Sequence, residues 1–263
     1  YAVWSGLPLG TPGFGDMPET EKTGTVWSVR LGPDGGFDPS SVRRELEVPE
    51  FFVGQDDFRR AGPSWPVADI AFPDCIDQGI MILSERGGLR NLGLDAEEPF
   101  ATPRESRVLR YEMGEDGAWK AVGRYDVGFS ERKPPAVQPF LRAGASGAAA
   151  FGYGYDEKGA IDPTRPNQSL WMAGDHLCSP EGPCFNPGSS AFDDDSQVHG
   201  IQGTPEPAFA ELAPNGAFRV YPVKGRVSNP DGPAQSYMID ADVNVDADGK
   251  PNPSELARND ATM

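Results

Sequence analysis

The chain has little of what helical, membrane-spanning or metal-rich proteins need. Only 2 of its 263 residues are histidine and only 3 are cysteine. No apolar run approaches the roughly 18–20 residues that cross a bilayer as a helix, so we expect no direct membrane insertion. Leucine-rich amphipathic stretches are missing, which argues against a helical fold. No Gly-x-Ser-x-Gly elbow, Walker loop or zincin helix is present, so no catalytic class is indicated by a local motif.

Positive charge is also scarce. The sequence contains 23 Lys and Arg residues against 40 Asp and Glu residues, which gives a formal net charge of −17 at pH 7. Such a surface repels the phosphates of nucleic acids and anionic lipids, so we expect no nucleic-acid partner. An acidic surface suits solubility, a cation-rich setting or a basic protein partner.

The cysteines suggest one short covalent loop. Cys178 and Cys184 flank the segment Ser-Pro-Glu-Gly-Pro. Closing a ring over so few residues costs little entropy, so the sequence predicts a disulfide here. Disulfides persist in oxidising compartments, and we therefore expect an extracytoplasmic protein, periplasmic or secreted. Cys75 is left over and is interpreted as a buried packing residue.

What the chain does have is glycine, proline and many short apolar segments. There are 32 Gly and 27 Pro, and 38% of the residues are hydrophobic. Short segments of β-branched and aromatic residues between turn formers are typical of an all-β fold. The predicted strands lie at 1–6, 25–31, 43–48, 67–72, 79–88, 107–113, 121–127, 148–155, 168–175, 208–212, 219–223 and 235–240.

Three Asx-Gly turns make an internal repeat visible. Each joins two predicted strands and is followed by an aromatic residue two positions after its first glycine. Asx-Gly between strands is the strongest short hairpin signal, because a type I′ turn needs positive φ at both central residues. The turns are Asp34-Gly35, Asp116-Gly117 and Asn215-Gly216, and the aromatic residues are Phe37, Trp119 and Phe218.

The repeat of strand, turn, strand, link, strand, Asx-Gly turn and strand resembles a β-propeller. Runs of four-stranded units at a coarse period are the signature of that fold. About three blades are visible, and residues 1–263 are interpreted as one propeller-like domain. Neither a WD dipeptide nor a kelch double glycine ends the units, so no named propeller family is indicated. A pair of β-sandwiches is the alternative.

The two ends of the chain bear on the number of propeller blades. Tyr1 already lies in a predicted strand, and the chain ends just after another one. Closed propellers have about 4–8 blades, so three are too few. We therefore expect either part of a longer protein or a subunit whose ring another chain completes.

The sharpest motif follows the last predicted strand. From Asn244 to Glu255 the residues fit a calcium loop of the form D/N-x-D-x-D-G, with oxygen-bearing residues at the ninth and twelfth positions. Calcium takes six to eight oxygens, and glycine at the sixth position permits the sharp turn. The predicted ligands are Asn244, Asp246, Asp248, the carbonyl of Lys250, Asn252 and Glu255.

This loop resembles an EF-hand loop and also the calcium loops of integrin-type (FG-GAP) propeller blades. Its position directly after a predicted strand favours the second resemblance, which implies a structural Ca²⁺. Two features depart from both patterns: Pro251 stands where a β-branched apolar residue is usual, and no helix precedes the loop. The alternative interpretation is a solvated acidic turn.

A second cluster joins the two histidines to carboxylates. His199 directly follows the run from Asp193 to Val198, and Asp175-His176 lies upstream. Histidines with nearby carboxylates suit a transition metal or acid–base chemistry. Three consecutive aspartates also suit an exposed loop. The tryptophans, at 4, 27, 65, 119 and 171, are interpreted as core residues.

Two functions from different classes follow. The first is a secreted or periplasmic, calcium-stabilised, non-enzymatic propeller module that acts as a scaffold or binds a protein partner, including another subunit that completes the assembly. The second is a propeller hydrolase or oxidoreductase with a metal-dependent site gathered at the central axis. Its candidate residues at strand edges are Asp69, Glu85, Asp175, His176 and Asp240.

Overall fold

The computed structural model describes residues 1–4, 12–13, 16, 18, 21, 23–48, 67–74, 79–86, 106–128, 144–158, 160–177, 198–211 and 237–240. Every named element in these residues is a strand, and the pairings between strands are antiparallel. The expected all-β class is therefore confirmed.

The strands form three main sheets. The N-terminal sheet has the order β1 (Ala2–Trp4), β2 (Thr25–Leu31) and β3 (Phe37–Glu47). The central sheet has the order β13 (Ala210–Glu211), β7 (Trp119–Tyr125), β6 (Val108–Met113), β5 (Ile80–Glu85) and β4 (Val67–Ala71). The C-terminal sheet has the order β14 (Tyr237–Asp240), β12 (Val198–Pro205), β11 (Ser169–Leu177) and β8 (Ala145–Gly152). A small hairpin pairs β9 (Gly154–Tyr155) with β10 (Ile161–Asp162).

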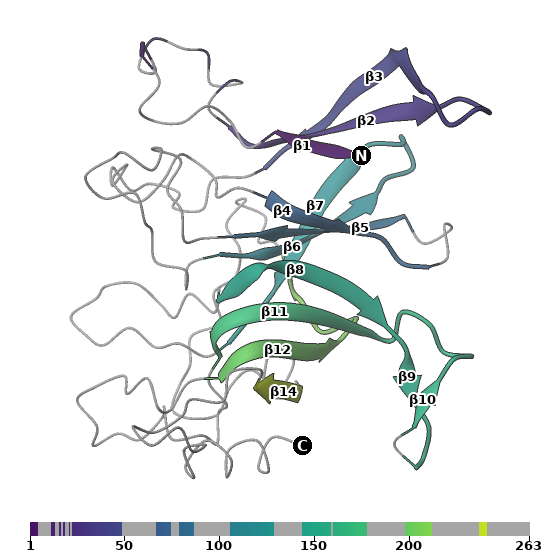
Figure 1. The fold of residues 1–263 in the computed structure, drawn as a ribbon, viewed down its shortest axis with the longest axis vertical. Coiled ribbons are helices and arrows are strands. Elements are labelled where there is room, and N and C mark those ends of the chain that lie inside the picture. The colour runs from purple at the N-terminus through teal and green to yellow at the C-terminus, as the bar shows by residue number, and fades with distance from the viewer. Residues whose placement is uncertain are drawn as a thin grey trace.

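The three sheets stack in layers, with the central sheet between the other two (Figure 1). Strand β5 shows why, because all six of its residues are buried. Successive residues of a strand point to opposite faces. Ile80 and Ile82 enter a core shared with β8 and β11, whereas Met81 and Leu83 enter a core shared with β2. A strand covered on both faces needs this continuous apolar run.

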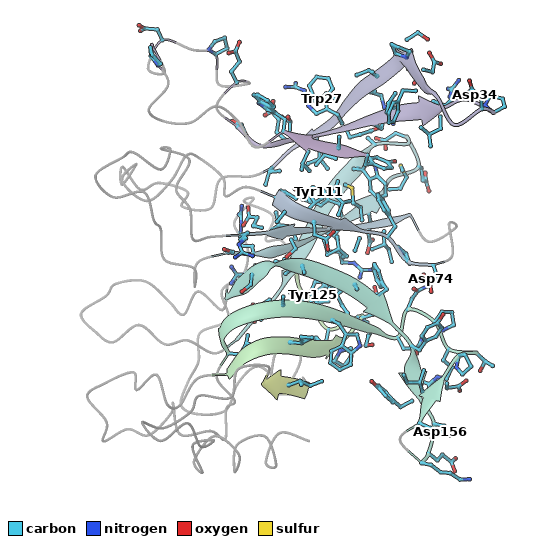
Figure 2. All side chains as sticks on the ribbon, in the orientation of Figure 1. Trp27, Asp34, Asp74, Tyr111, Tyr125 and Asp156 are labelled. Atoms are coloured by element: carbon cyan, nitrogen blue, oxygen red, sulfur yellow. The ribbon has the colours of Figure 1, made fainter. Side chains whose placement is uncertain are left out.

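The two cores are built from different sheets. The first core packs the central sheet on the C-terminal sheet, and the second packs it on the N-terminal sheet. Tyr125 belongs to the first core and Tyr111 to the second, so these side chains leave opposite faces of the central sheet (Figure 2). Face-to-face stacking of antiparallel sheets, about 10 Å apart, is common to sandwiches and to adjacent propeller blades.

The described residues form no closed ring or barrel. The central unit has the predicted succession of strands, since β4, β5, β6 and β7 pair in chain order. The C-terminal sheet does not follow this succession, because β14 pairs with β12, whereas β13, which lies between them in the sequence, belongs to the central sheet. The all-β fold class is confirmed, whereas the propeller architecture is a proposal.

Two of the three predicted Asx-Gly turns lie in the described residues, and both close hairpins of a type other than the predicted one. Gly35 and Gly117 have φ of 80° and 72°, but the preceding aspartates do not have positive φ. Each glycine amide donates to the carbonyl three residues earlier, at 2.9 Å. A type I′ turn is therefore wrong here, and the geometry is that of a three-residue loop in which glycine supplies the left-handed position. Asn215-Gly216 lies outside the described residues.

The predicted disulfide cannot be placed in the fold. Cys178, Cys184 and Cys75 all lie outside the described residues. No helix in the described part of the chain is long and apolar enough to cross a membrane.

Candidate functional site

The predicted calcium ligands cannot be placed in the fold. Asn244, Asp246, Asp248, Lys250, Asn252 and Glu255 lie outside the described residues. The structure does show that the sequence just before the loop forms a strand, β14, as predicted. Among the described side chains, no group of three or more His, Cys, Asp and Glu residues is arranged to hold a metal.

Two of the five predicted axis residues have structural partners. Asp69 on β4 accepts a hydrogen bond from the backbone amide of Ala149 on β8 at 3.0 Å, which ties the central sheet to the C-terminal sheet. Glu85, at the end of β5, is fully buried. It accepts bonds from the guanidinium of Arg107 at 2.6 and 2.8 Å and from the Arg107 amide at 3.1 Å. Such a multiply bonded carboxylate is held for structure, because most of its roughly four lone-pair sites are already used.

The remaining three axis candidates are in the C-terminal sheet. Asp175 and His176 lie at an irregular point of β11, and Asp240 lies at the end of β14. The structure describes these residues by their backbone. The predicted candidates therefore divide between two sheets and do not share one strand edge.

A second buried polar group lies around Arg110 on β6. Its guanidinium donates to Glu112 at 2.9 Å and to the Tyr125 hydroxyl at 2.8 Å, and it also pairs with Glu206. The guanidinium lies 4.6 Å from the ring centre of Phe209, within cation–π range. Burial alone lowers the pKa of Arg110, but Tyr125, Glu206 and Glu112 together raise it above its ordinary value. Burial raises the pKa of the Tyr125 hydroxyl, which donates to the Glu206 carbonyl at 2.6 Å. This group fixes residues 206–209 onto the central sheet.

The largest departure from the sequence prediction is on the N-terminal sheet. Trp4 and Trp27 were predicted to be core residues, but both are exposed; Trp119 is buried as predicted. Trp65 lies outside the described residues. Along β2, Val26 faces the core, and Trp27 and Leu31 alternate onto the opposite, outer face.

This outer face carries a set of exposed apolar side chains. Trp4 pairs with Thr25, two residues before Trp27, and Leu31, four residues after Trp27, pairs with Phe37. Alternation along β2 therefore puts Trp4, Leu31 and Phe37 on the face of Trp27. Leu31 is 59% exposed and Phe37 is 73% exposed. We call this set the outer-face patch; it consists of Trp4, Trp27, Leu31 and Phe37.

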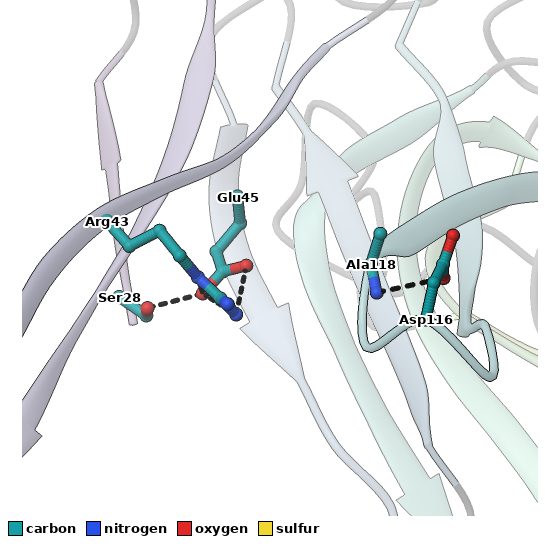
Figure 3. A network of polar contacts seen from close by, with 5 residues as sticks. All are labelled: Ser28, Arg43, Glu45, Asp116 and Ala118. Atoms are coloured by element: carbon teal, nitrogen blue, oxygen red, sulfur yellow. Dashed lines mark hydrogen bonds and ion pairs between the residues drawn. The ribbon is translucent and has the colours of Figure 1, made fainter.

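Polar bonds hold the hairpin that presents the patch. The Ser28 hydroxyl on β2 donates to Glu45 on β3, and the Arg43 guanidinium binds both oxygens of the same carboxylate at 2.8 and 2.9 Å (Figure 3). Only 3% of the Glu45 side chain is exposed, whereas Arg43 is 62% exposed. The Trp27 indole N–H donates to the Thr25 hydroxyl at 2.9 Å, which fixes the ring across the outer face. The patch is therefore exposed on an ordered hairpin.

A second aromatic group lies beside the N-terminus. The rings of Tyr1, Phe72 and Trp119 contact one another, with centroid separations of 5.0, 6.2 and 6.3 Å. Tyr1 and Phe72 are partly exposed. These rings cover one end of the second core, so we interpret them as packing residues.

The exposure of the outer-face patch could be predicted only from the pairing of the strands. The tryptophans lie in or beside predicted strands, and the sequence does not say which face of a strand a neighbouring sheet will cover.

Comparison with known proteins returned no match: no protein-family model, no curated protein and no solved structure is significantly similar to this chain.

Proposed function

We propose that the chain is a non-enzymatic, extracytoplasmic β-module that binds a protein partner through the outer-face patch. The observation that carries this proposal is the exposure of Trp4, Trp27, Leu31 and Phe37 on one face of an ordered sheet. Large apolar side chains exposed together on one face of a domain mark an interaction site, and tryptophan and phenylalanine are enriched in such sites.

The charge of the chain narrows the class of partner. A net charge of −17 favours association with a protein of net positive charge, through steering of the encounter. Apolar residues at the centre of the patch then supply the binding energy, since aromatic anchors dominate most interfaces. Nucleic acids and anionic membranes are disfavoured by the same charge.

Two further features support the module as a propeller unit with calcium. Three antiparallel sheets stacked face to face are the arrangement expected of adjacent blades, and a partner chain that completes a ring would cover an outer sheet such as the N-terminal one. The loop from Asn244 to Glu255 carries the oxygen ligands that Ca²⁺ prefers. With the predicted Cys178–Cys184 disulfide, this loop favours a periplasmic or secreted setting.

Site-specific photo-crosslinking tests the proposal. A photoreactive phenylalanine analogue at Phe37 is expected to give a discrete adduct with one protein in extracts of the source organism. The same analogue at the exposed Lys158, in the loop between β9 and β10, serves as the control. Leu31→Ser in the Phe37-labelled chain should reduce the adduct at least about tenfold, because a buried leucine contributes about 1.5–3 kcal/mol.

The outcomes separate the possible occupants of the patch. A heterologous adduct from position 37 that is absent from position 158 and sensitive to Leu31→Ser supports the proposal. An adduct of twice the mass of the chain would show a second copy as the occupant and support the subunit form of the proposal. No adduct, or equal adducts from both positions, would overturn it.

A further inference from the structure

One tryptophan lies on the outer face of the C-terminal sheet. Trp171 belongs to β11, and its neighbours Leu170 and Met172 point into the first core. Because successive residues of a strand point to opposite faces, the Trp171 side chain points away from that core. It is partly exposed, unlike the core residue that the sequence predicted.

Two glycines on the neighbouring strands show how the indole lies. A Cβ at Gly152 on β8 would be 2.6 Å from both Cδ1 and Nε1 of Trp171. A Cβ at Gly203 on β12 would be 2.6–2.8 Å from Cζ3, Cη2 and Cε3. The ring therefore spans β11 and rests on the strand at each side of it. At each end, atoms from both long edges of the ring are almost equally close to the backbone. The indole thus lies flat, with one π-face on the sheet and the other directed away from it.

The face around the ring is uncharged. Between Ser169 and Ala173 the register with β8, β12 and β14 is continuous, and it places only uncharged residues on this face, among them Ala150, Ile201 and Ile239. Ile201 and Ile239 pair with each other and are 41% and 49% exposed. In the whole chain 24% of the residues are charged and the net charge is −17. An outer face without charge in such a chain is complementary to a neutral ligand rather than to a cation or an anion.

Polar atoms lie at one end of the ring. The Cβ position of Gly152 is 2.6 Å from the Trp171 Nε1 and 2.8 Å from the Ser169 Oγ, so both atoms border the same point. The indole N–H is a donor, and a serine hydroxyl both donates and accepts. The Ser169 hydroxyl donates to the Tyr153 carbonyl at 3.4 Å, and its oxygen keeps its capacity to accept. The platform therefore has a flat apolar surface and a polar edge.

We propose that Trp171 is the stacking platform of a binding site for neutral carbohydrates built from pyranose rings of the glucose or N-acetylglucosamine type. When the hydroxyls of such a ring are equatorial, its C–H groups gather on the two faces and carry a slight positive charge. The face of an indole is the negative part of its quadrupole and attracts them. The hydroxyls at the edge of the sugar then meet Nε1 and the Ser169 hydroxyl. An aromatic surface with a few placed polar groups is the usual composition of a small-ligand site.

This site is separate from the outer-face patch. The patch lies on the N-terminal sheet and Trp171 lies on the C-terminal sheet, with the central sheet between them (Figure 1). The indole N–H of Trp27 donates to the Thr25 hydroxyl at 2.9 Å, so its polar edge is used within the chain. The loss of carbohydrate binding would therefore leave the proposed protein partner of the patch untouched.

Titration with cellohexaose and with chitohexaose, followed by ¹H–¹⁵N NMR of the indole N–H groups, is the direct test. The chain has 5 tryptophans, and the signals missing from the spectra of Trp171→Phe and Trp27→Phe assign these two. Either hexasaccharide should shift the Trp171 signal and leave the Trp27 signal in place. Sorbitol, a neutral polyol without a ring, should shift neither signal at the same concentration.

Variants test the platform itself. Trp171→Ala should weaken hexasaccharide binding at least about fivefold, the lower end of what stacking on an aromatic side chain contributes. Gly203→Ala keeps the indole but pushes it off the sheet, because the new Cβ would lie 2.6 Å from the ring, and it should weaken binding as well. Tyr155→Ala removes an exposed aromatic ring from the neighbouring β9–β10 hairpin and should leave binding unchanged. Circular dichroism shows whether each variant keeps the fold, and the shift of the wild-type signal needs no variant.

Four results would overturn the proposal. The first is a wild-type Trp171 signal that millimolar cellohexaose and chitohexaose both leave unmoved. The second is a folded Trp171→Ala chain that binds the hexasaccharides as tightly as the wild type. The third is a larger shift with tetramethylammonium than with either hexasaccharide, which would make the ring a cation–π site. The fourth is self-association that Trp171→Ala abolishes and the sugars do not affect, which would show a second copy of the chain on this face.

Discussion

At the scale of single residues, the buried ion pair of Glu85 with Arg107 fixes one end of the central sheet. Both side chains are essentially unexposed, and their nearest atoms are 2.6 Å apart. Glu85→Ala should lower the free energy of unfolding by about 3–5 kcal/mol, because it leaves a buried guanidinium without its main counter-charge. Urea denaturation measures this loss. The double variant Glu85→Leu with Arg107→Met should recover much of it, and a double variant as unstable as the single one would contradict the charge argument.

A carboxylate in a turn gives a pH-dependent prediction. Asp116 accepts a hydrogen bond from the Ala118 amide at 3.2 Å (Figure 3). It also pairs with Lys120 at 3.2 Å, and these contacts hold the pKa of Asp116 below the ordinary 3.8. Because the folded-state pKa is the lower one, the stabilisation is complete above the ordinary pKa and is lost as the pH falls through the folded-state value. Carboxyl ¹³C titration should give a midpoint below 3.8, with the Ala118 amide shift following the same curve. Lys120→Ala should raise the midpoint while keeping it below 3.8; a midpoint at or above 3.8 in the wild type would refute the contacts.

At the scale of elements, a glycine allows β8 to approach the central sheet. Gly147 has φ of 89°, and a Cβ there would lie 2.8 Å from the Cβ atoms of both Ala68 and Arg86. Gly147→Ala should therefore destabilise the chain by at least about 1–3 kcal/mol, through strain at positive φ and through the clash. Thermal unfolding checks this, with Ala148→Ser at the neighbouring exposed position as the control. Equal melting temperatures for the two variants would show that this approach is not close in solution.

The strands also show which elements could be predicted from the sequence and which could not. Two strands, β2 and β6, were predicted within one residue of their observed bounds, whereas β5 ends three residues before its predicted end. β12 was not predicted, because its sequence VHGIQGTP contains two glycines and little apolar surface. Its second glycine is required by packing, since a Cβ at Gly203 would lie 2.6 Å from the Trp171 ring. Local propensity cannot detect a strand that is determined by its neighbours.

The same limit of local sequence patterns applies to the candidate sites. The two histidines and their carboxylate neighbours could be selected from the sequence by residue type alone. Their register could not, because it depends on the pairing of β12 with β11 and on the bulge between Gly174 and Leu177. Likewise, the exposure of Trp27 depends on which face of β2 the central sheet covers. Both are consequences of tertiary pairing, which residue patterns specify only through the whole fold.

At the scale of the whole molecule, we expect calcium binding to stabilise the C-terminal sheet through its last strand, β14. β14 pairs with β12 over four residues, and the predicted calcium loop follows directly in the sequence. A Ca²⁺ bound only by the folded chain stabilises it by mass action, by about 2.7 kcal/mol at 100 times the dissociation constant. For a chain of this size that corresponds to a rise in melting temperature of roughly 5–10 °C.

Chelation with EGTA should therefore lower the melting temperature by that amount, and restored Ca²⁺ should reverse the loss. The double variant Asp246→Asn with Asp248→Asn should unfold at the chelated temperature whether or not Ca²⁺ is present, because it removes two charged ligands of the loop. Glu157→Gln removes a charge from an exposed turn elsewhere and should keep the full calcium response. A melting temperature that EGTA leaves unchanged would make the loop a solvated acidic turn.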